Sequence, residues 1–155
     1  MAIWHDDFPL ALVNEHSRDT LVSHLGIEFV EAGADYVTAK MPVDARTRQP
    51  AHALHGGASV ALAETLASWA ATFVVDREKN YCVGLEINAN HVRAASSGWV
   101  SGTARPIHLG RSTQVWEVRV TDEEDRLVCI SRVTMAVLAT PNRYGNAPGR
   151  GPAQT

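Results

Sequence analysis

One long apolar stretch with a single charged side chain constrains this chain most. Residues 58–75 are rich in alanine and leucine, contain no proline, and carry only Glu64 as a charged residue. Alanine and leucine have the highest helix propensities, and the glycines at 56 and 57 suit a tight turn into a helix. Because apolar residues fall on every side of this helix, we expect it to be buried at the centre of the fold.

Glu64 requires an explanation at that position. An unpaired charge inside a protein costs several kcal/mol, so a carboxylate on a buried helix indicates either an ion-pair partner or a ligand. At the start of the helix, His55-Gly56-Gly57 presents backbone N–H groups at the positive end of the helix dipole, where an oxyanion can be stabilised. Small residues and one valine surround Glu64 on its face of the helix: Gly57, Val60, Ala61, Ser68 and Ala71.

The spacing of these two features predicts a dimer. His55 and Glu64 are nine residues apart, which places them on roughly opposite helix faces and about 13 Å apart along the axis. They therefore cannot serve one reacting carbonyl within a single subunit. If both act on the same substrate, the helix start of one chain must face Glu64 of a second chain.

The remainder of the chain predicts an α+β fold. Gln49-Pro50 lies in the polar connection that leads to His55, and Pro106 is expected to mark a strand end or an edge. One long helix, preceded by a hairpin and followed by four antiparallel strands, is typical of the hotdog architecture, in which a curved sheet wraps round a helix. We expect short helices near residues 9–13 and 20–25, with Asp19 as the second N-cap, and strands at 27–32, 36–43, 82–92, 99–107, 113–121 and 127–138.

Length and composition favour one soluble domain. The 155 residues fit a single domain at 1–140, followed by a tail at 141–155 that is rich in Gly, Pro and Asn and is predicted to be disordered. A net charge of −3 gives no reason to propose nucleic acid as a partner. The polar residues within 58–75 argue against a membrane span, and no signal peptide pattern is present, so we expect a cytoplasmic protein. Cys82 and Cys129 are expected to be inert buried thiols.

The residues also carry a family resemblance. It extends from Ile3 to about Leu138 and rests on MPVDARTRQP, LHGGASVALAETLAS, VGLEINANHVR, PIHLG and SRVTMAVL. These segments resemble the hotdog-fold acyl-CoA thioesterases of the phenylacetate and 4-hydroxybenzoyl-CoA type. Within that family the chain is most similar to the branch of the 1,4-dihydroxy-2-naphthoyl-CoA thioesterases and the enterobactin proofreading thioesterases.

The resemblance implies roles for residues at matching positions. Glu64 corresponds to the helix glutamate that acts as nucleophile or general base, and Ser68, one turn later, to the residue that orients water. Gln49, His55 and Gly56 correspond to the groups that bind and polarise the thioester carbonyl from the other subunit.

The resemblance also implies a substrate-binding surface. His91 is similar to a residue that lines the acyl pocket, and Trp69 is expected beside the site. Arg93 and the turn at 108–112 resemble the surface that meets the CoA nucleotide, with His108, Gly110, Arg111 and Ser112 as its candidate contacts.

Thioester hydrolysis suits these residues chemically. A simple thiol has a pKa of about 8.5, so the thiolate leaves without a strong general acid. No metal or cofactor is expected, because CoA is part of the substrate and His52 and His55 have no further ligand nearby. We expect an aryl- or hydroxyaryl-CoA, or an acyl-pantetheine carrier, as substrate, and self-association as a dimer or a dimer of dimers. The alternatives are a hotdog-fold enoyl-thioester hydratase or dehydratase and a non-catalytic acyl-CoA-binding protein, which would need no carboxylate.

Overall fold

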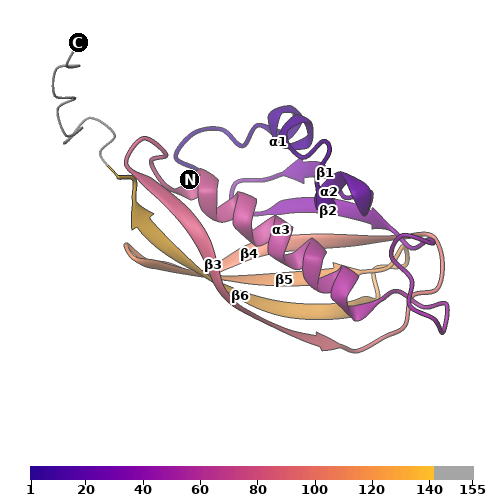
Figure 1. Cartoon of the computed structure of the whole chain (residues 1–155). Helices are drawn as coiled ribbons and strands as arrows, with labels where there is room; N and C mark the ends of the chain where they lie inside the picture. The colour runs from indigo at the N-terminus through magenta and orange to yellow at the C-terminus, as the bar shows by residue number, and fades with distance from the viewer. Residues whose placement is uncertain (142–155) are drawn as a thin grey trace, which may run out of the picture.

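The fold is one curved antiparallel sheet wrapped round a central helix. The structure, a computed structural model, describes residues 1–141, so the predicted tail lies outside the described residues except for Pro141. Figure 1 shows α3 lying along the concave face of the sheet, which confirms the hotdog architecture. The strand order is β1-β2-β4-β5-β6-β3. The elements are α1 (Leu10–His16), α2 (Leu21–His24), β1 (Glu28–Ala32), β2 (Val37–Pro42), α3 (Gly56–Val74), β3 (Asn80–His91), β4 (Trp99–Leu109), β5 (Thr113–Thr121) and β6 (Leu127–Ala139).

The helix α3 is the core of the domain. Leu62 and Leu66 are completely buried, and the β4 backbone approaches them so closely that a Cβ at Gly102 would lie 2.7 Å from Leu66 Cδ1. Within residues 1–141, α3 is also the one helix long and apolar enough to cross a membrane by composition alone. Its packing under the sheet accounts for that composition.

The helix begins two residues earlier than the sequence pattern predicts. It starts at Gly56 with His55 as N-cap, and His55 Nδ1 accepts a 2.8 Å hydrogen bond from the Gly57 N–H. This side-chain cap satisfies an N–H group that otherwise lacks a partner in the first turn, so both glycines join the helix.

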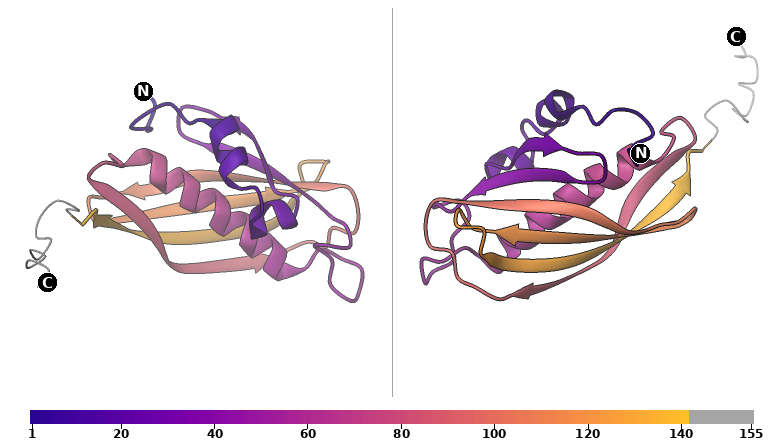
Figure 2. Two further views of the ribbon diagram at one scale, coloured as in Figure 1. Left: turned by 45° about the horizontal axis from the view of Figure 1, so that its top comes forward. Right: turned by 180° about the vertical axis from the view of Figure 1, so that it is seen from behind.

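The N-terminal segment covers one end of α3 and closes the β1 edge of the sheet. Figure 2 shows α1 on the same side of the sheet as α3, and the His5 N–H donates to Phe73 O at the C-terminal end of that helix. Asn14 of α1 bonds both backbone groups of Phe29, donating to its carbonyl at 2.8 Å and accepting from its N–H at 2.9 Å. The predicted N-cap of α2 at Asp19 is wrong, because Thr20 occupies that position and its Oγ1 accepts from the Val22 N–H.

The other edge strand, β3, is long and largely exposed. No strand described in residues 1–141 pairs with its outer side. A β-bulge lies between Gly84 and Glu86, and Leu85 at this bulge is 62% exposed.

The β4 strand continues past Pro106 instead of ending there. Its pairing with β2 stops at Ala104, and beyond that residue β5 is its one neighbouring strand among residues 1–141. Pro106 therefore lies in a locally exposed edge, where a missing N–H is tolerated.

Candidate functional site

Two cavities open along α3, one beside Gly56 at the start of the helix and one beside Glu64. The Gly56 cavity has a volume of about 440 Å³ and the Glu64 cavity about 480 Å³. The Gly56 cavity is lined by Gln49, Ala53, Leu54, Gly56, Ser59, His91, Val92, Arg93, Ala94 and Val128. The Glu64 cavity is lined by Gly57, Val60, Ala61, Glu64, Gly84, Leu85, Glu86 and Ile87. The two linings have no residue in common, which agrees with the prediction that one subunit separates these groups.

The backbone N–H of Gly56 is available at the start of α3. No acceptor within residues 1–141 takes a hydrogen bond from it, and it lies at the positive end of the helix dipole. The His91 ring covers this position so closely that a Cβ at residue 56 would lie 3.0 Å from His91 Nε2. Only glycine therefore fits here without moving His91.

His55 is held in one neutral tautomer by its capping role. Because Nδ1 accepts the Gly57 N–H, the ring proton of the neutral imidazole lies on Nε2. The exposed Nε2–H can then donate a hydrogen bond to a ligand. The sequence pattern alone predicted no such orientation, since it depends on where the helix begins.

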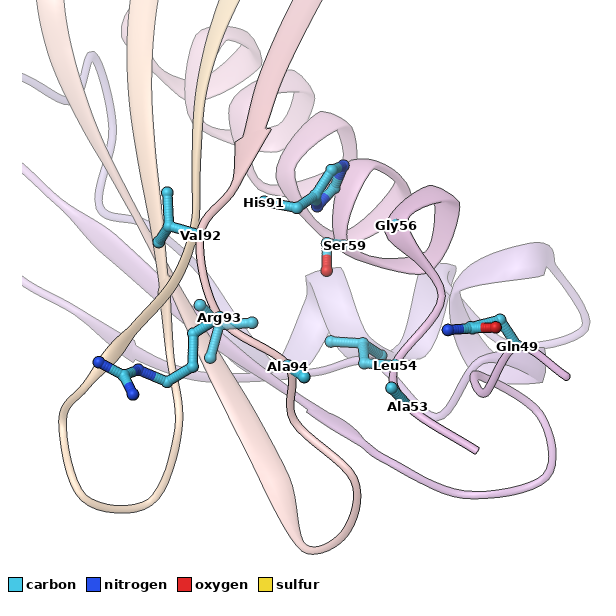
Figure 3. A pocket seen from close by; sticks show the side chains of 10 residues that line it. Gln49, Ala53, Leu54, Gly56, Ser59, His91, Val92, Arg93 and Ala94 are labelled. Carbon is cyan, nitrogen blue, oxygen red and sulfur yellow. The ribbon is translucent and has the colours of Figure 1, made fainter. Parts of the chain in front are cut away.

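The loop before α3 orients Gln49. Thr47 is buried, its Oγ1 donates to Pro42 O at 2.6 Å, and its own carbonyl accepts the His55 N–H. Gln49 Oε1 accepts the Ala51 N–H at 2.9 Å, which leaves the amide NH₂ group as the part that can donate to a ligand. Figure 3 shows this nitrogen directed towards the interior of the Gly56 cavity.

Glu64 is a half-buried carboxylate without a cationic partner. None of the salt bridges in the described part of the chain involves it, so the ion-pair interpretation finds no support there. Burial raises the pKa of Glu64, and a hydrogen bond from the Ser68 side chain acts in the opposite direction. Its Oε1 lies so close to the β3 backbone that a Cβ at Gly84 would overlap it. The bulge at this point of β3 brings the strand against the carboxylate.

The structure does not bring every predicted residue to these cavities. Trp69 is absent from both linings and stacks on His16 and Phe73, with ring centroids 6.5 and 6.0 Å apart respectively. Its assigned substrate contact therefore stays a prediction, and one chain alone does not provide it.

The predicted CoA surface is divided between two ends of the sheet. Arg93 follows the end of β3 and lines the Gly56 cavity. The turn after Leu109 lies near the C-terminal part of α3, where the neighbouring Gln114 side chain donates to Ala71 O. Residues 108–112 and Arg93 can therefore contact one ligand only if a second chain contributes.

Ser59 is a residue of the Gly56 cavity that the sequence reasoning missed. It follows Gly56 by three residues, which puts both on one face of the helix, and this spacing was the available signal. By contrast, His52 and His55 remain without further metal ligands, since residues 1–141 contain no group of three or more candidate ligand side chains.

Comparison with known proteins connects this geometry to a family. Residues 51–129 match the Thioesterase superfamily, a stretch that contains both cavities' helix residues. The proofreading thioesterase EntH from Cronobacter turicensis is 49% identical over 136 residues, covering 88% of this chain and 98% of that protein. EntH from Klebsiella pneumoniae is 50% identical over 135 residues, covering 87% and 98% respectively.

The solved structures agree with the sequence relatives. A mutant (Q49A) of the thioesterase PA1618 from Pseudomonas aeruginosa superposes with a TM-score of 0.89 at 45% identity, covering 90% of this chain and all of that one. The match therefore includes the fold, the helix and the loop before it. On this coverage and identity, the chain belongs to the thioesterase superfamily and is a thioester hydrolase.

Proposed function

We propose that the enzyme hydrolyses an aryl or hydroxyaryl thioester of CoA, or of a pantetheine carrier, with Glu64 as nucleophile or general base. The observation that carries this proposal is the half-buried carboxylate facing an open cavity without a cationic partner among residues 1–141. Such a carboxylate is held ready to act on a ligand instead of stabilising the fold. Water adds to the thioester carbon, the C–S bond breaks, and the products are a carboxylate and the CoA thiol.

The Gly56 N–H is proposed as the oxyanion donor for this reaction. Charge develops on the carbonyl oxygen as the tetrahedral intermediate forms, and one preorganised donor contributes about 3 kcal/mol to its stabilisation. The Gln49 amide lines the Gly56 cavity, and His55, which lines neither cavity in one chain, caps the same helix start. Together they offer side-chain donors beside a backbone donor that the helix dipole reinforces.

The substrate class is supported by the walls of the Gly56 cavity. Leu54, Val92 and Val128 supply apolar surface, and the His91 ring forms a flat wall over Gly56. A flat acyl group fits such a site better than a flexible chain does, because fewer rotors must be ordered on binding. Arg93 is exposed at the rim, where it can attract the phosphates of a CoA nucleotide.

We propose that two chains associate through β3 to complete each site. Glu64 lies eight residues after Gly56, or about 12 Å along the helix axis, and in a different cavity. The β3 strand offers an unpaired edge with exposed apolar side chains at Tyr81, Val83 and Leu85. Antiparallel pairing of two β3 edges would place two α3 helices side by side and bury these side chains. Pairing of such dimers into a tetramer remains a further prediction.

The substitution Glu64→Gln tests the proposed chemistry directly. It preserves the size of the side chain and removes the charge, so thiol release from aryl-CoA substrates should fall by at least about 100-fold. Thiol release would be measured across benzoyl-, hydroxybenzoyl- and fatty acyl-CoA, with circular dichroism to verify that the fold is retained. Glu86→Gln, on the exposed side of the same cavity, is the matched control and should keep most of the activity.

The proposed reaction requires no metal or organic cofactor. Wild-type turnover should therefore be unchanged after exhaustive dialysis against a chelator. Near wild-type hydrolysis by Glu64→Gln would remove the role assigned to this carboxylate, and preference for fatty acyl-CoA would remove the proposed substrate class.

A further inference from the structure

The loop at residues 49–53 is a closed turn beside the Gly56 cavity, which Gln49 and Ala53 line. The Gln49 N–H donates to Ala53 O and the His52 N–H donates to Gln49 O, both at 2.8 Å. This pattern is typical of a three-residue loop with proline in its second position, closed by a residue in the left-handed region. His52 is that residue, with a φ of 64°.

The left-handed conformation is strained for histidine. A residue with a Cβ meets steric crowding there that glycine avoids, although His, Asn and Asp adopt it more readily than other residues do. Such a conformation persists only where the surrounding structure holds it, and it is found most often at functional sites. His52 is exposed and lines neither cavity in one chain, so the loop uses its backbone torsion and not a contact of its imidazole.

The same loop determines where the Gln49 amide points. Gln49 Oε1 accepts the Ala51 N–H at 2.9 Å, and Ala51 immediately precedes His52. Figure 3 shows the Gln49 nitrogen directed towards the interior of the Gly56 cavity. If residue 52 left the left-handed region, the loop could close only with other torsions at the residues before it. The Ala51 N–H would then no longer be held against Gln49 Oε1.

A second loop of the same kind occurs in the turn between β5 and β6. The Asp122 N–H donates to Arg126 O and the Asp125 N–H donates to Asp122 O, both at 3.0 Å. Asp122 Oδ1 accepts the Glu124 N–H at 3.0 Å, and Asp125 has a φ of 57°. None of residues 122–126 lines either cavity. A substitution at Asp125 therefore measures what strain in such a loop does to stability alone.

Resting on the proposed function, in which the Gln49 amide donates to the thioester carbonyl, we infer that His52 is a positioning residue whose left-handed backbone holds that amide in the Gly56 cavity. His52 acts through Gln49 and touches no reacting atom. Asparagine accepts the left-handed region and can replace His52, whereas a β-branched residue cannot. Activity therefore depends on the backbone torsion at residue 52.

Three substitutions at His52 test this inference by thiol release from benzoyl-CoA. His52→Val should lower kcat/KM by about tenfold, the effect of one hydrogen bond to the reacting group. His52→Ala should lower it by less, because alanine is not β-branched. His52→Asn should stay within about twofold of wild type. Asp125→Val is the matched control: both valine variants should lose thermal stability, but only His52→Val should lose activity.

The kinetic results also define what would overturn the inference. Equal losses in His52→Asn and His52→Val would assign the role to the imidazole. Equal losses in His52→Val and Asp125→Val would reduce the effect to general destabilisation, and full activity in His52→Val would remove it. Circular dichroism verifies the fold, and His52→Ala carries the test if His52→Val does not fold.

Measurements on the unliganded protein separate this inference from the proposed function. The side-chain NH₂ of Gln49 gives an NMR signal that is assigned by its absence in Gln49→Ala. In His52→Val this signal should shift and the Ala51 N–H should exchange faster with solvent, whereas His52→Asn and Asp125→Val should match wild type. That result supports the role of His52 even if the enzyme hydrolyses no aryl-CoA. An unchanged Gln49 signal in His52→Val, or the same shift in His52→Asn, overturns it.

Discussion

At the scale of single residues, the proposed chemistry uses side chains whose acceptor atoms are already hydrogen-bonded, so that their donor groups remain available to a ligand. His55 Nδ1 caps the helix and so leaves an Nε2–H, while Gln49 Oε1 is occupied and leaves an NH₂ group. Glu64 combines burial with the absence of a basic neighbour among residues 1–141. Local hydrogen bonds orient His55 and Gln49, whereas the environment of Glu64 also depends on the packing of β3 against its carboxylate.

The raised pKa of Glu64 predicts the acidic limb of the pH–rate profile. The reaction needs the carboxylate, so kcat/KM should fall as Glu64 is protonated, with a midpoint above the ordinary value of 4.5. The Ser68 hydrogen bond lowers the pKa of Glu64, and Ser68→Ala should therefore move this limb to higher pH. A profile of kcat/KM between pH 4 and pH 9 for both proteins checks the two shifts. A limb at or below 4.5 would contradict the desolvated environment.

The same pKa predicts how Glu64 affects stability. A carboxyl group whose pKa is raised on folding favours the folded state fully below its unfolded pKa, and this contribution is lost as pH rises through the folded pKa. Glu64→Gln should consequently be more stable than wild type at pH 8, with a higher Tm. The difference should shrink towards pH 4. Thermal unfolding at both pH values measures it, and equal Tm differences at the two pH values would exclude this linkage.

At the scale of elements, sequence patterns predicted the order and type of the strands but not their irregularities. Residues 113–121 alternate Trp116, Val118 and Val120 with polar neighbours, and they form β5 with the predicted bounds. Leu85 also alternates with polar neighbours in the sequence, yet it lies at a β-bulge and is exposed. Bulges arise from the pairing of two strands, so one strand's own periodicity does not reveal them.

The part of the candidate site that lies on one helix was predictable from the sequence, and the part that depends on tertiary packing was not. Gly56, Glu64 and Ser68 lie on one helix, whose 3.6-residue period fixes their relative directions. Trp69 and the turn at 108–112 were assigned by resemblance, and their positions relative to a substrate depend on tertiary packing and on the proposed second chain. Ser59 was not predicted, because its three-residue spacing from Gly56 puts both on one helix face but does not show that a cavity opens there.

The hydrogen bonds between α1 and β1 predict a stability effect. Asn14→Ala removes both the donor and the acceptor that Phe29 uses, and leaving those backbone groups unsatisfied should cost about 1–3 kcal/mol of unfolding free energy. Urea denaturation measures this loss. Asn14→Asp keeps the acceptor and loses the donor, so an intermediate value is expected, and wild-type stability in Asn14→Ala would show that water replaces the side chain at no cost.

At the scale of the whole molecule, the chain has the features of half an active unit. Its two cavities hold complementary groups on one helix but share no lining residue within the described chain. The exposed apolar side chains of β3 lie beside the Glu64 cavity, which Leu85 itself lines. A substitution at this edge would thus affect both the association of two chains and the catalytic activity.

Mixed dimers test the shared site. Glu64→Gln and Gln49→Ala proteins should each be inactive alone, but in a dimer that contains one of each, both lesions fall on a single site. The other site is then wild type, so activity should return on subunit exchange and approach half of the wild-type value per mixed dimer. Tagged subunits and thiol release would establish the composition and the activity of the same sample. Purified mixed dimers that stay inactive would rule out sites built from two chains.

Because the β1 edge is covered, one sheet edge among residues 1–141, β3, is left for pairing with another chain. Asn14 occupies the outward backbone groups of Phe29, and the bulge between Phe29 and Glu31 interrupts the regular pairing there. Among residues 1–141, β3 is therefore the sheet edge better suited to pairing with another strand. In the proposed pairing each chain would be a monofunctional unit in the terms of polymer chemistry, and two β3 edges would terminate one another. Opening the β1 edge would make the unit bifunctional, and chains that pair through β3 as proposed could then extend into a fibre.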